Sequence, residues 1–477
     1  MKSRAHNVAA WLARHDPERL AVVDQDHALT YAMLDERCAR LAGLLAEAGV
    51  ARGERVALRL GNRSAYLEAL FACARLAAIA VPLNNRLAPP EVAHQIADCA
   101  PRALLCEPHL EPAEPPPFVL HAGEPYEKAL RSAPAHDVEP VDPEEPLVIL
   151  YTSGTTGAPK GALLPQRKTL FNSLNAQIFF GLTGQDRVLV ALPLFHSFGL
   201  NILSVPTLYA GGRVVLHARF DPERVWEAVE EHAITFFGAV PTLFQQLLET
   251  LPGHRLGSLR FLFTAGAAIP VEVIRAYGAH GLVLKQGYGQ TETSILTCLD
   301  ARDAIRKAGS VGKPVFHAEI RVDAPPGRAG EILVRGPTTM LGYWGRPAET
   351  AEAFRDGWLH TGDLACVDDE GFLTLVSRAR DMYISGGENV YPAEVEAVYA
   401  GHPAVAEIAV VGVPDARWGE TGCAWVVPAA GARPDPQALR AWGRERLAAF
   451  KLPGEFRFVS ELPRTVTGKV QKHLLVG

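Results

Sequence analysis

One stretch of the chain, residues 151–161, carries more anion-binding groups than an ordinary turn needs. It holds three glycines, four Ser or Thr hydroxyls and one lysine within eleven positions. Glycines let backbone N–H groups approach a phosphate, hydroxyls add hydrogen-bond donors, and a lysine adds a mobile positive charge. A polar turn after a strand is the simpler alternative, because Gly, Ser and Thr are common in turns. The number of donors favours a phosphate-binding loop.

The neighbours of this loop limit the fold further. The apolar run at residues 147–150 is typical of a buried strand, so the loop follows a strand end. Lys160 is followed by Gly161, and no Gly-Lys-Ser or Gly-Lys-Thr sequence occurs in the chain. The loop is therefore not a Walker P-loop, and the P-loop ATPase and kinase classes lose their main support.

Helix and strand patterns alternate through most of the chain. A strand at residues 55–60, a mostly buried helix at 64–77 and a strand at 187–192 are examples. This alternation predicts an α/β fold. The segment 108–146, rich in Pro, Glu and Ala, is expected to be a surface connection. Beyond residue 312 shorter alternating strands predict a β-rich part.

A charged, glycine-rich crossing at residues 378–392 is the predicted domain boundary. Downstream, two helices and three strands predict a compact α+β unit of roughly 95 residues. We therefore predict a large N-terminal domain, residues 1–379, built of α/β subdomains with a β-rich subdomain. A small, mobile α+β C-terminal domain is predicted at 380–477. The expected downstream elements are helices at 393–399 and 436–447 and strands at 408–413, 422–427 and 455–459.

Composition excludes several classes of protein. A net charge of −6 gives no general affinity for nucleic acid or for an anionic membrane. No apolar run approaches the roughly 18 residues that a transmembrane helix needs, and the N-terminus lacks a signal-peptide core. The seven cysteines are scattered and never form a Cys-x-x-Cys pair. They predict reduced thiols in a cytoplasmic protein without a zinc site.

Two more loops place functional groups at predicted strand ends. His196, between Phe195 and Phe198, follows the strand at 187–192, where open α/β sheets bind ligands. A capping or core histidine is the alternative. The small residues at 265–270 would let a flat ring lie against the backbone, although they also suit a close-packed turn.

The stretch at residues 283–293 repeats the arrangement of a strand followed by a polar loop. Tyr288 offers a ring for stacking, Thr291 a phosphate donor and Glu292 an acidic ligand for a cation such as Mg²⁺. The same residues could instead begin a helix, with Thr and Glu as its caps.

Two isolated residues complete the set. Asp363 follows a glycine and is either a turn residue or a carboxylate that holds the two hydroxyls of a ribose. Lys469 lies in a basic tail, which is commonly a solvated chain end. Its Thr-Gly-Lys turn would also let the lysine project from a loop.

Taken together and in this order, these stretches resemble the adenylate-forming superfamily of acyl-CoA synthetases, peptide-synthetase adenylation domains and luciferases. The resemblance covers nearly the whole chain and rests on at least five ordered motifs. Residues 303–314 and 385–396 are similar to the pattern of fatty acyl-CoA synthetases.

The resemblance implies a reaction in two half-steps that uses ATP, Mg²⁺ and coenzyme A. A carboxylate attacks the α-phosphorus of ATP and gives acyl-AMP and pyrophosphate. The thiol of coenzyme A then attacks the acyl carbon and releases AMP. The first step brings an anion against a polyanion, so it requires positive charge and a metal rather than covalent chemistry by the protein.

The resemblance also implies a role for each residue. Lys469, Thr291, Glu292 and His196 are the implied catalytic residues, and Lys469 would bridge the carboxylate and the α-phosphate. Thr152 and Glu292 are the implied Mg²⁺ ligands. The implied ATP-binding residues cradle the phosphates, enclose the adenine or hold the ribose. They are Thr152, Ser153, Gly154, Thr155, Thr156, Gly157, Lys160, Gly266, Ala267, Ala268, Gln286, Gly287, Tyr288, Asp363 and Arg378.

In this family the C-terminal domain rotates between the two half-reactions. Arg380 occupies the matching hinge position, where other members commonly carry Asp or Lys, so the energetics of the hinge stay open. Gly386 and Gly387 would bind coenzyme A, with Gly387 lining the tunnel for its pantetheine arm. His196 would lie near the acyl pocket, with Phe195 and Phe198 as walls.

The resemblance leaves the acid open. A fatty acid is the first expectation, and an aromatic or dicarboxylic acid such as succinylbenzoate is the alternative. Transfer to a carrier protein in place of free coenzyme A is another, although no fused carrier domain is recognisable. A non-enzymatic sensor would be expected to lose Lys469 or Glu292, and both are present. The expected partners are a small carboxylic acid, ATP and coenzyme A, and a homodimer is compatible with the sequence.

Overall fold

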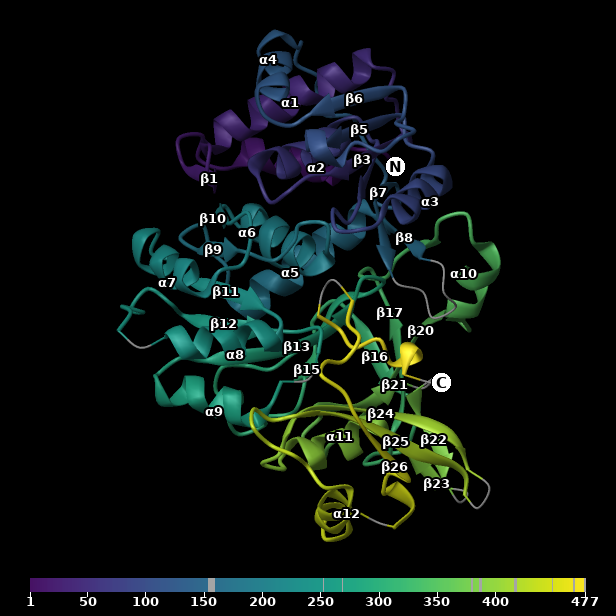
Figure 1. Cartoon of the computed structure of the whole chain (residues 1–477). Coiled ribbons are helices and arrows are strands. Elements are labelled where there is room, and N and C mark those ends of the chain that lie inside the picture. Colours follow the sequence, from purple (N-terminus) through teal and green to yellow (C-terminus); the bar gives the residue numbers. More distant parts are fainter. Residues whose placement is uncertain are drawn as a thin grey trace. The chain divides into compact units, whose positions relative to one another are not determined.

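The computed structural model describes the 477-residue chain except residues 153–158, 252, 268, 379–380, 386–387, 416–417, 448, 466–467 and 476–477, and the side chains at 377, 378, 388 and 389. The chain forms two compact units. The first contains Met1–Ile320 and Val334–Leu359, and the second contains Arg321–Leu333 and His360–Gly477. Figure 1 labels their elements along the chain. The hinge that we predict at Arg380, which directly follows the predicted domain boundary, lies outside the described residues and stays a prediction.

The first unit contains a seven-stranded sheet in the order β18-β8-β7-β4-β3-β5-β6. Strands β3, β4, β5, β6 and β7 run parallel, and β8 turns back antiparallel on β7. Every residue of α2 is buried, which explains its almost continuous apolar sequence. The strands are β3 (Arg55–Arg59), β4 (Ile79–Pro82), β5 (Ala103–Cys106), β6 (Phe118–His121), β7 (Pro146–Thr152), β8 (Lys160–Pro165) and β18 (Gly342–Tyr343), and the helices are α1 (Tyr31–Glu47), α2 (Ser64–Arg75), α3 (Pro89–Cys99) and α4 (Glu124–Ser132).

A nine-stranded sheet in the order β15-β14-β13-β12-β11-β9-β10-β1-β2 completes the first unit. Its middle is parallel, from β1 through β10, β9, β11 and β12 to β13. The strands are β1 (Leu20–Val23), β2 (Ala28–Thr30), β9 (Arg187–Val190), β10 (Arg213–Leu216), β11 (Phe236–Ala239), β12 (Phe261–Thr264), β13 (Leu284–Gln290), β14 (Ser294–Cys298) and β15 (Lys313–Pro314). The helices are α5 (Gln166–Phe180), the π-helix η4 (Phe198–Ser204), α6 (Val205–Tyr209), α7 (Pro222–Glu231), α8 (Pro241–Thr250) and α9 (Val271–Ala279).

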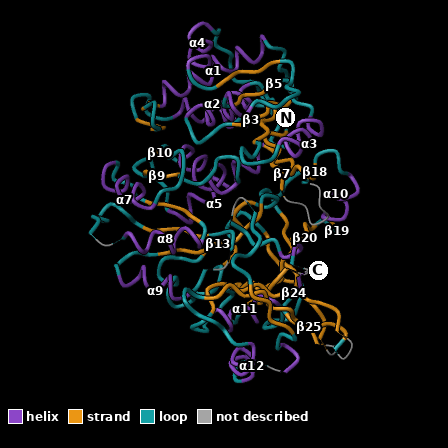
Figure 2. The backbone as a smooth tube through the Cα atoms, viewed as in Figure 1, coloured by secondary structure: helices purple, strands orange, loops and turns teal. Residues whose placement is uncertain are grey.

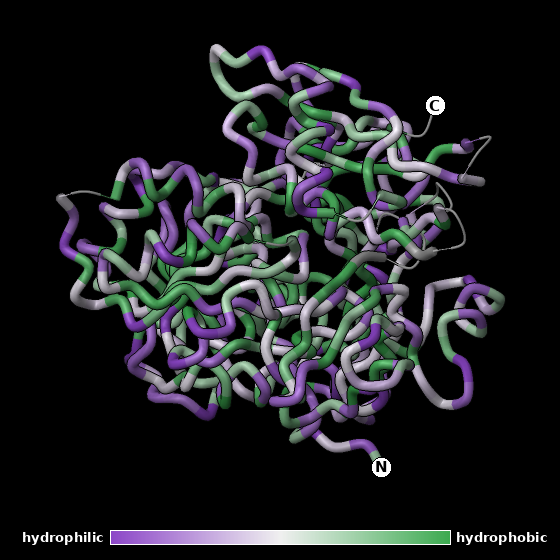
Figure 3. Tube along the Cα trace, turned by 90° about the horizontal axis from the view of Figure 1, so that it is seen from below, coloured by the Kyte–Doolittle hydropathy of each residue, from purple (hydrophilic) through white to green (hydrophobic). Residues whose placement is uncertain are grey.

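Helices cover both faces of this second sheet. Neighbouring residues of a strand point to opposite faces, and β11 shows the effect directly. The Phe236 ring lies 5.8 Å from the ring of Phe180 on α5, whereas the Phe237 ring lies 5.9 Å from that of Phe244 on α8. Figure 3 colours the whole chain by hydropathy, with hydrophobic residues in green. A sheet covered on both faces explains why its strands read as unbroken apolar runs.

A third, five-stranded sheet contains the points at which the chain leaves one unit and enters the other. Its strand order is β16-β17-β20-β19, and β21 pairs with β20. Its elements are β16 (Glu319–Val322), β17 (Gly330–Arg335), α10 (Pro347–Ala353), β19 (Phe354–Arg355), β20 (Trp358–Val367) and β21 (Leu373–Arg378). The fourth sheet has the order β23-β22-β25-β24, and β26 runs parallel to β25. Figure 2 labels two of its strands, β24 and β25, and draws strands in orange. It is built from β22 (Tyr383–Ser385), β23 (Glu388–Val390), α11 (Pro392–Ala400), β24 (Val405–Asp415), β25 (Gly419–Pro428), α12 (Pro436–Arg444) and β26 (Glu455–Phe458).

These sheets confirm the predicted fold class, an α/β part with a β-rich part and a smaller α+β part. The expectation of a plain surface connection at 108–146 is wrong, because the segment contains β6 and α4. Tyr126 and Leu130 are buried one helical turn apart, and the Tyr126 hydroxyl donates to Glu68 at 2.6 Å. In the described part of the chain, no helix is long and apolar enough to cross a membrane.

Candidate active site

The predicted phosphate loop is the turn of a hairpin between β7 and β8. Thr152 and Lys160 lie directly opposite each other, and the Thr152 hydroxyl donates to the carbonyl oxygen of Lys160 at 3.4 Å. The register therefore places both residues at the same end of the hairpin. The remaining predicted loop residues Ser153, Gly154, Thr155, Thr156 and Gly157 lie outside the described residues.

The stretch predicted at 283–293 belongs to a second hairpin and does not start a helix. β13 ends at Gln290, residues 291–293 form a turn, and β14 begins at Ser294. Ser294 has a φ of 61°, a left-handed conformation that is strained for a residue with a side chain. A Cβ on Gly289 would lie 1.9 Å from the Ser294 carbonyl oxygen, so position 289 accepts only glycine in this geometry. The turn that presents Thr291 and Glu292 is therefore tightly specified.

Glu292 is linked to the phosphate hairpin through Tyr343 of β18. The Tyr343 hydroxyl donates to Oε1 of Glu292 at 3.1 Å, and Lys160 Nζ lies 5.5 Å from the centre of the same ring. These contacts bring the predicted metal ligand Glu292 into one cluster with Lys160 and, across the hairpin, Thr152. A carboxylate and a hydroxyl are oxygen donors of the kind that Mg²⁺ prefers, so the cluster fits this ion.

A fully buried lysine supports the same turn. Lys168 of α5 donates to the hydroxyl of Ser294, and Asn172, one helical turn later, accepts the N–H of Ile295 at 3.3 Å. Burial lowers the pKa of Lys168 to about 7, an effect that Glu292 partly offsets. Sequence reasoning missed both side chains. The signal that could have found them is the unusual number of polar residues in α5, a helix in the middle of an α/β domain.

The predicted adenine site lies at the ends of two neighbouring parallel strands. Thr264 at the end of β12 pairs with Gln286 of β13. Among the described residues, neither the buried Thr264 Oγ1 nor the buried Gln286 Oε1 has a hydrogen-bond partner. A buried polar atom without a partner costs about 1–3 kcal/mol, so two side by side indicate a place for a polar ligand. The chain continues from this edge into Gly266, which has a φ of 87°, and Ala267, and both residues are exposed. Ala268 lies outside the described residues.

Phe198, Phe263 and two glycines form the apolar part of the site. The rings of Phe198 and Phe263 meet edge to face at 5.7 Å. A Cβ on Gly287 would lie 2.8 Å from Phe263 Cζ, and one on Gly238 would lie 3.2 Å from Phe198 Cε2. The two rings therefore pack directly against the backbone of β11 and β13 at these glycines. Phe195, the other predicted wall, is 6% exposed and belongs to the hydrophobic core.

His196 lies in the turn after β9, where its backbone N–H donates to the carbonyl oxygen of Pro193 at 3.1 Å. Its Nε2 atom is buried and has no hydrogen-bond partner among the described residues. Burial lowers the pKa of His196 to about 4, and the positive charge of Arg86 acts in the same direction. The imidazole is therefore neutral near pH 7, and its unpaired nitrogen is available to a ligand.

We expect the His196 imidazole to titrate near pH 4, about 2 pH units below an exposed histidine. Carbon-13 labelled histidine followed by NMR from pH 8 to below pH 4 measures this value, and the resonance lost in His196→Gln assigns it. Titration of that resonance above pH 6 would contradict a buried imidazole.

The remaining predicted residues belong to the second unit. Asp363 of β20 is 8% exposed and stands opposite Arg378 of β21 in the sheet register. Lys469 follows Gly468, whose φ is 84°, and its carbonyl oxygen accepts the N–H of Thr465 at 2.7 Å. Thr467, the first residue of the predicted Thr-Gly-Lys turn, lies outside the described residues. Arg380, Gly386 and Gly387 lie outside the described residues.

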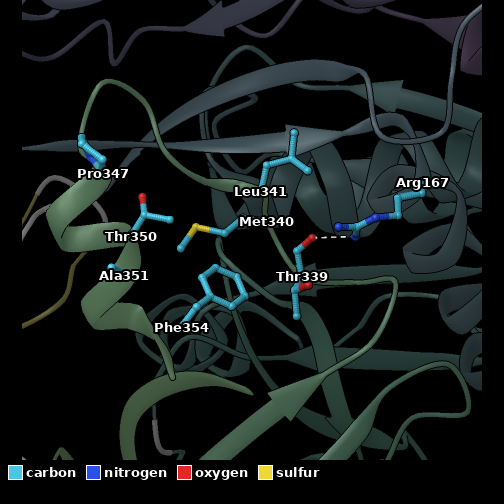
Figure 4. A pocket seen from close by; sticks show the side chains of 8 residues that line it. All are labelled: Arg167, Thr339, Met340, Leu341, Pro347, Thr350, Ala351 and Phe354. Carbon is cyan, nitrogen blue, oxygen red and sulfur yellow. Dashed lines mark hydrogen bonds between the residues drawn. The ribbon is translucent and has the colours of Figure 1, made fainter. Parts of the chain in front are cut away.

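A cavity of about 530 Å³ lies beside α10 (Figure 4). None of its lining residues was predicted as a site residue, but Arg167 on its wall donates to the carbonyl oxygens of Pro337 and Thr339. The next residue, Met340, donates its N–H to the carbonyl oxygen of Glu292 at 2.8 Å. The cavity thus lies next to the segment that supports the Glu292 turn. Its lining consists of Arg167, Thr339, Met340, Leu341, Pro347, Thr350, Ala351 and Phe354.

Two matches to known families cover most of the chain. The family of AMP-binding enzymes matches residues 9–344, and the AMP-binding enzyme C-terminal domain matches residues 394–469. A feruloyl-CoA synthase of Amycolatopsis sp is 45% identical, with 96% of each chain covered. An indoleacetate–CoA ligase of Aromatoleum aromaticum is 41% identical, over 98% of this chain and 96% of the relative.

A solved structure extends the similarity to the whole fold. The o-succinylbenzoate CoA synthetase of Bacillus subtilis, in complex with its acyl-adenylate intermediate, matches with a TM-score of 0.89 and 34% identity. The match covers 98% of this chain and 97% of that one. From the two family matches, these relatives and the clustered site, we conclude that the chain belongs to the AMP-binding enzyme family and is an AMP-forming acid–thiol ligase.

Proposed function

We propose that this enzyme joins an aromatic carboxylic acid to coenzyme A through an acyl-AMP intermediate, with ATP and Mg²⁺. The observation that carries the choice of acid is the edge-to-face pair of Phe198 and Phe263 over Gly287 and Gly238. Aromatic side chains favour edge-on and offset contacts with another ring, and glycines leave room for a flat group. The relatives named feruloyl-CoA synthase and indoleacetate–CoA ligase support the same class of acid.

In the proposed first half-reaction, the protein supplies charge and position. Lys160 and the loop before it would hold the β- and γ-phosphates, and Thr291 would contact the α-phosphate. Thr152 and Glu292 would hold Mg²⁺, which supplies positive charge against the phosphate oxygens when bound. The unpaired Gln286 and Thr264 oxygens would receive the amino group of adenine, because it is a hydrogen-bond donor.

The second unit carries further residues with proposed roles. Asp363 and Arg378 would hold the ribose, which their opposite positions on β20 and β21 support. Lys469 would bridge the attacking carboxylate and the α-phosphate. Rotation about Arg380 would then let Gly386 and Gly387 admit coenzyme A. His196 would lie beside the acyl group as a neutral ring.

The cellular setting follows the same argument. All seven cysteines are free thiols, and six of them are buried. We infer a cytoplasmic enzyme, because free thiols persist where the environment is reducing. A homodimer stays a prediction that sedimentation can test.

A panel of acids scored by pyrophosphate release tests the proposed substrate class. We expect hydroxycinnamic, indoleacetic or benzoic-type acids to exceed saturated fatty acids of graded length by about 100-fold in kcat/KM. Preference for a fatty acid would overturn the aromatic assignment and restore the first expectation from sequence. Each active acid is then offered free coenzyme A or a phosphopantetheinyl carrier protein, and exclusive transfer to the carrier would overturn the coenzyme A assignment.

A further inference from the structure

Tyr343 is the residue that touches both halves of the phosphate site. It lies on β18, beside the phosphate hairpin, and has no role in the argument from sequence. We propose that Tyr343 is a positioning residue that orients the Glu292 carboxylate for Mg²⁺ and supports the Lys160 ammonium beside the phosphates. This proposal rests on the proposed function, because it takes Glu292 and Lys160 as groups that bind metal and phosphate.

The first contact sets the direction of the carboxylate. The Tyr343 hydroxyl donates to Oε1 of Glu292 at 3.1 Å, and the Glu292 carbonyl oxygen accepts the N–H of Met340 at 2.8 Å. The segment 340–343 therefore holds Glu292 both at its main chain and at one carboxylate oxygen. A carboxylate has several lone pairs, so it can accept this bond and still bind a cation.

The second contact concerns the lysine. Lys160 Nζ lies 5.5 Å from the centre of the Tyr343 ring, within the range of a cation–π interaction. Such a contact keeps the ammonium near one position. It leaves the positive charge in place, whereas a carboxylate partner would neutralise it. The charge of Lys160 is therefore preserved for an anionic ligand.

The backbone around Tyr343 is held firmly enough for such a role. Tyr343 pairs with Ala162 of β8, and its N–H binds the Thr350 hydroxyl at 2.9 Å. The backbone N–H of the next residue, Trp344, donates to the Gly161 carbonyl oxygen at 2.7 Å. On the other side Arg167 holds the carbonyl oxygen of Thr339, the dashed line in Figure 4. The ring is thus fixed relative to both Lys160 and Glu292.

The decisive experiment measures ATP binding without an acid substrate, so that no turnover occurs. The dissociation constant for ATP is determined by isothermal titration calorimetry, once with excess Mg²⁺ and once with EDTA. Tyr343→Phe removes the hydroxyl and keeps the ring. We expect it to weaken binding of ATP with Mg²⁺ about tenfold, as loss of a hydrogen bond to a charged group predicts, and to leave binding in EDTA unchanged. Tyr343→Leu should weaken binding under both conditions, because it also removes the ring under Lys160.

Tyr277→Phe is the matched control. Tyr277 is buried, and its hydroxyl donates to the Phe244 carbonyl oxygen at 2.7 Å; neither residue is a predicted site residue. This variant loses one buried tyrosine hydrogen bond, so it reproduces a general loss of stability. Its affinity for ATP should equal that of the wild type under both conditions.

A double-mutant cycle separates positioning of Glu292 from a general disturbance. In a Glu292→Gln background, Tyr343→Phe should change ATP affinity less than twofold. An unchanged affinity of the single variant Tyr343→Phe with Mg²⁺ would overturn the proposal, as would an equal tenfold loss in the Glu292→Gln background. If wild-type binding of ATP does not depend on Mg²⁺ at all, the proposed role of Glu292 fails as well.

Discussion

Lys469→Ala is expected to lower the rate of pyrophosphate formation by roughly 1,000-fold and to leave thioester formation from supplied acyl-AMP mostly intact. The proposed role of Lys469 is a point charge between two anions, and alanine removes that charge entirely. The second half-reaction starts from acyl-AMP, a mixed anhydride in which the charge of the carboxylate is already lost, and it would use another position of the C-terminal part. Two assays on one protein measure the effect, namely pyrophosphate release from acid and ATP and thioester formation from acyl-AMP and coenzyme A.

Lys472→Ala is the matched control for this variant. Lys472 lies in the same basic tail, and its Nζ is paired with Glu396 at 2.6 Å. Its loss removes one positive charge from the same region, but it should change either rate less than about twofold, as is typical of a pair near the surface. Equal losses of both half-reactions in Lys469→Ala would contradict the assignment of the lysine to the first step alone.

Gly287→Ala is expected to lower kcat/KM for the acid by about 100-fold and to weaken ATP binding by a smaller factor, because Gly287 also belongs to the predicted adenine site. The added Cβ would lie 2.8 Å from Phe263 Cζ and 2.9 Å from the Thr297 carbonyl oxygen. Phe263 cannot easily retreat, because its ring packs edge to face on Phe180 at 4.8 Å and on Phe198 at 5.7 Å. Pyrophosphate release measured over a range of acid concentrations, with ATP binding measured separately, gives both quantities.

Two further variants define the cause of that loss. Gly257→Ala adds the same methyl group where no atom lies within 4 Å, so it should behave as wild type. Phe263→Leu in the Gly287→Ala background creates space for the methyl group and should recover part of the activity. A fully active Gly287→Ala enzyme would show that Gly287 and Phe263 do not shape the acid site.

The elements that sequence reasoning predicted well are those in which one signal dominates. The buried helix expected at 64–77 is α2 (Ser64–Arg75), and the strand expected at 408–413 lies within β24 (Val405–Asp415). Long apolar runs leave the chain few alternatives in water. The error at 108–146 has the opposite cause. There, proline and glutamate are frequent, and the helix α4 depends on burying only Tyr126 and Leu130.

The amino-acid sequence by itself determined the chemistry of this protein. The hydroxyl-rich loop, Glu292 and Lys469 carry their chemical character in their side chains and their order along the chain, which is why the family could be recognised. The tertiary structure alone decided which groups meet. Tyr343 is 51 residues from Glu292 along the chain, and Lys168 is 126 residues from Ser294. Such contacts arise from strand order and burial, which no local pattern encodes. The neutral state of His196 likewise follows from burial and not from the identity of its neighbours in sequence.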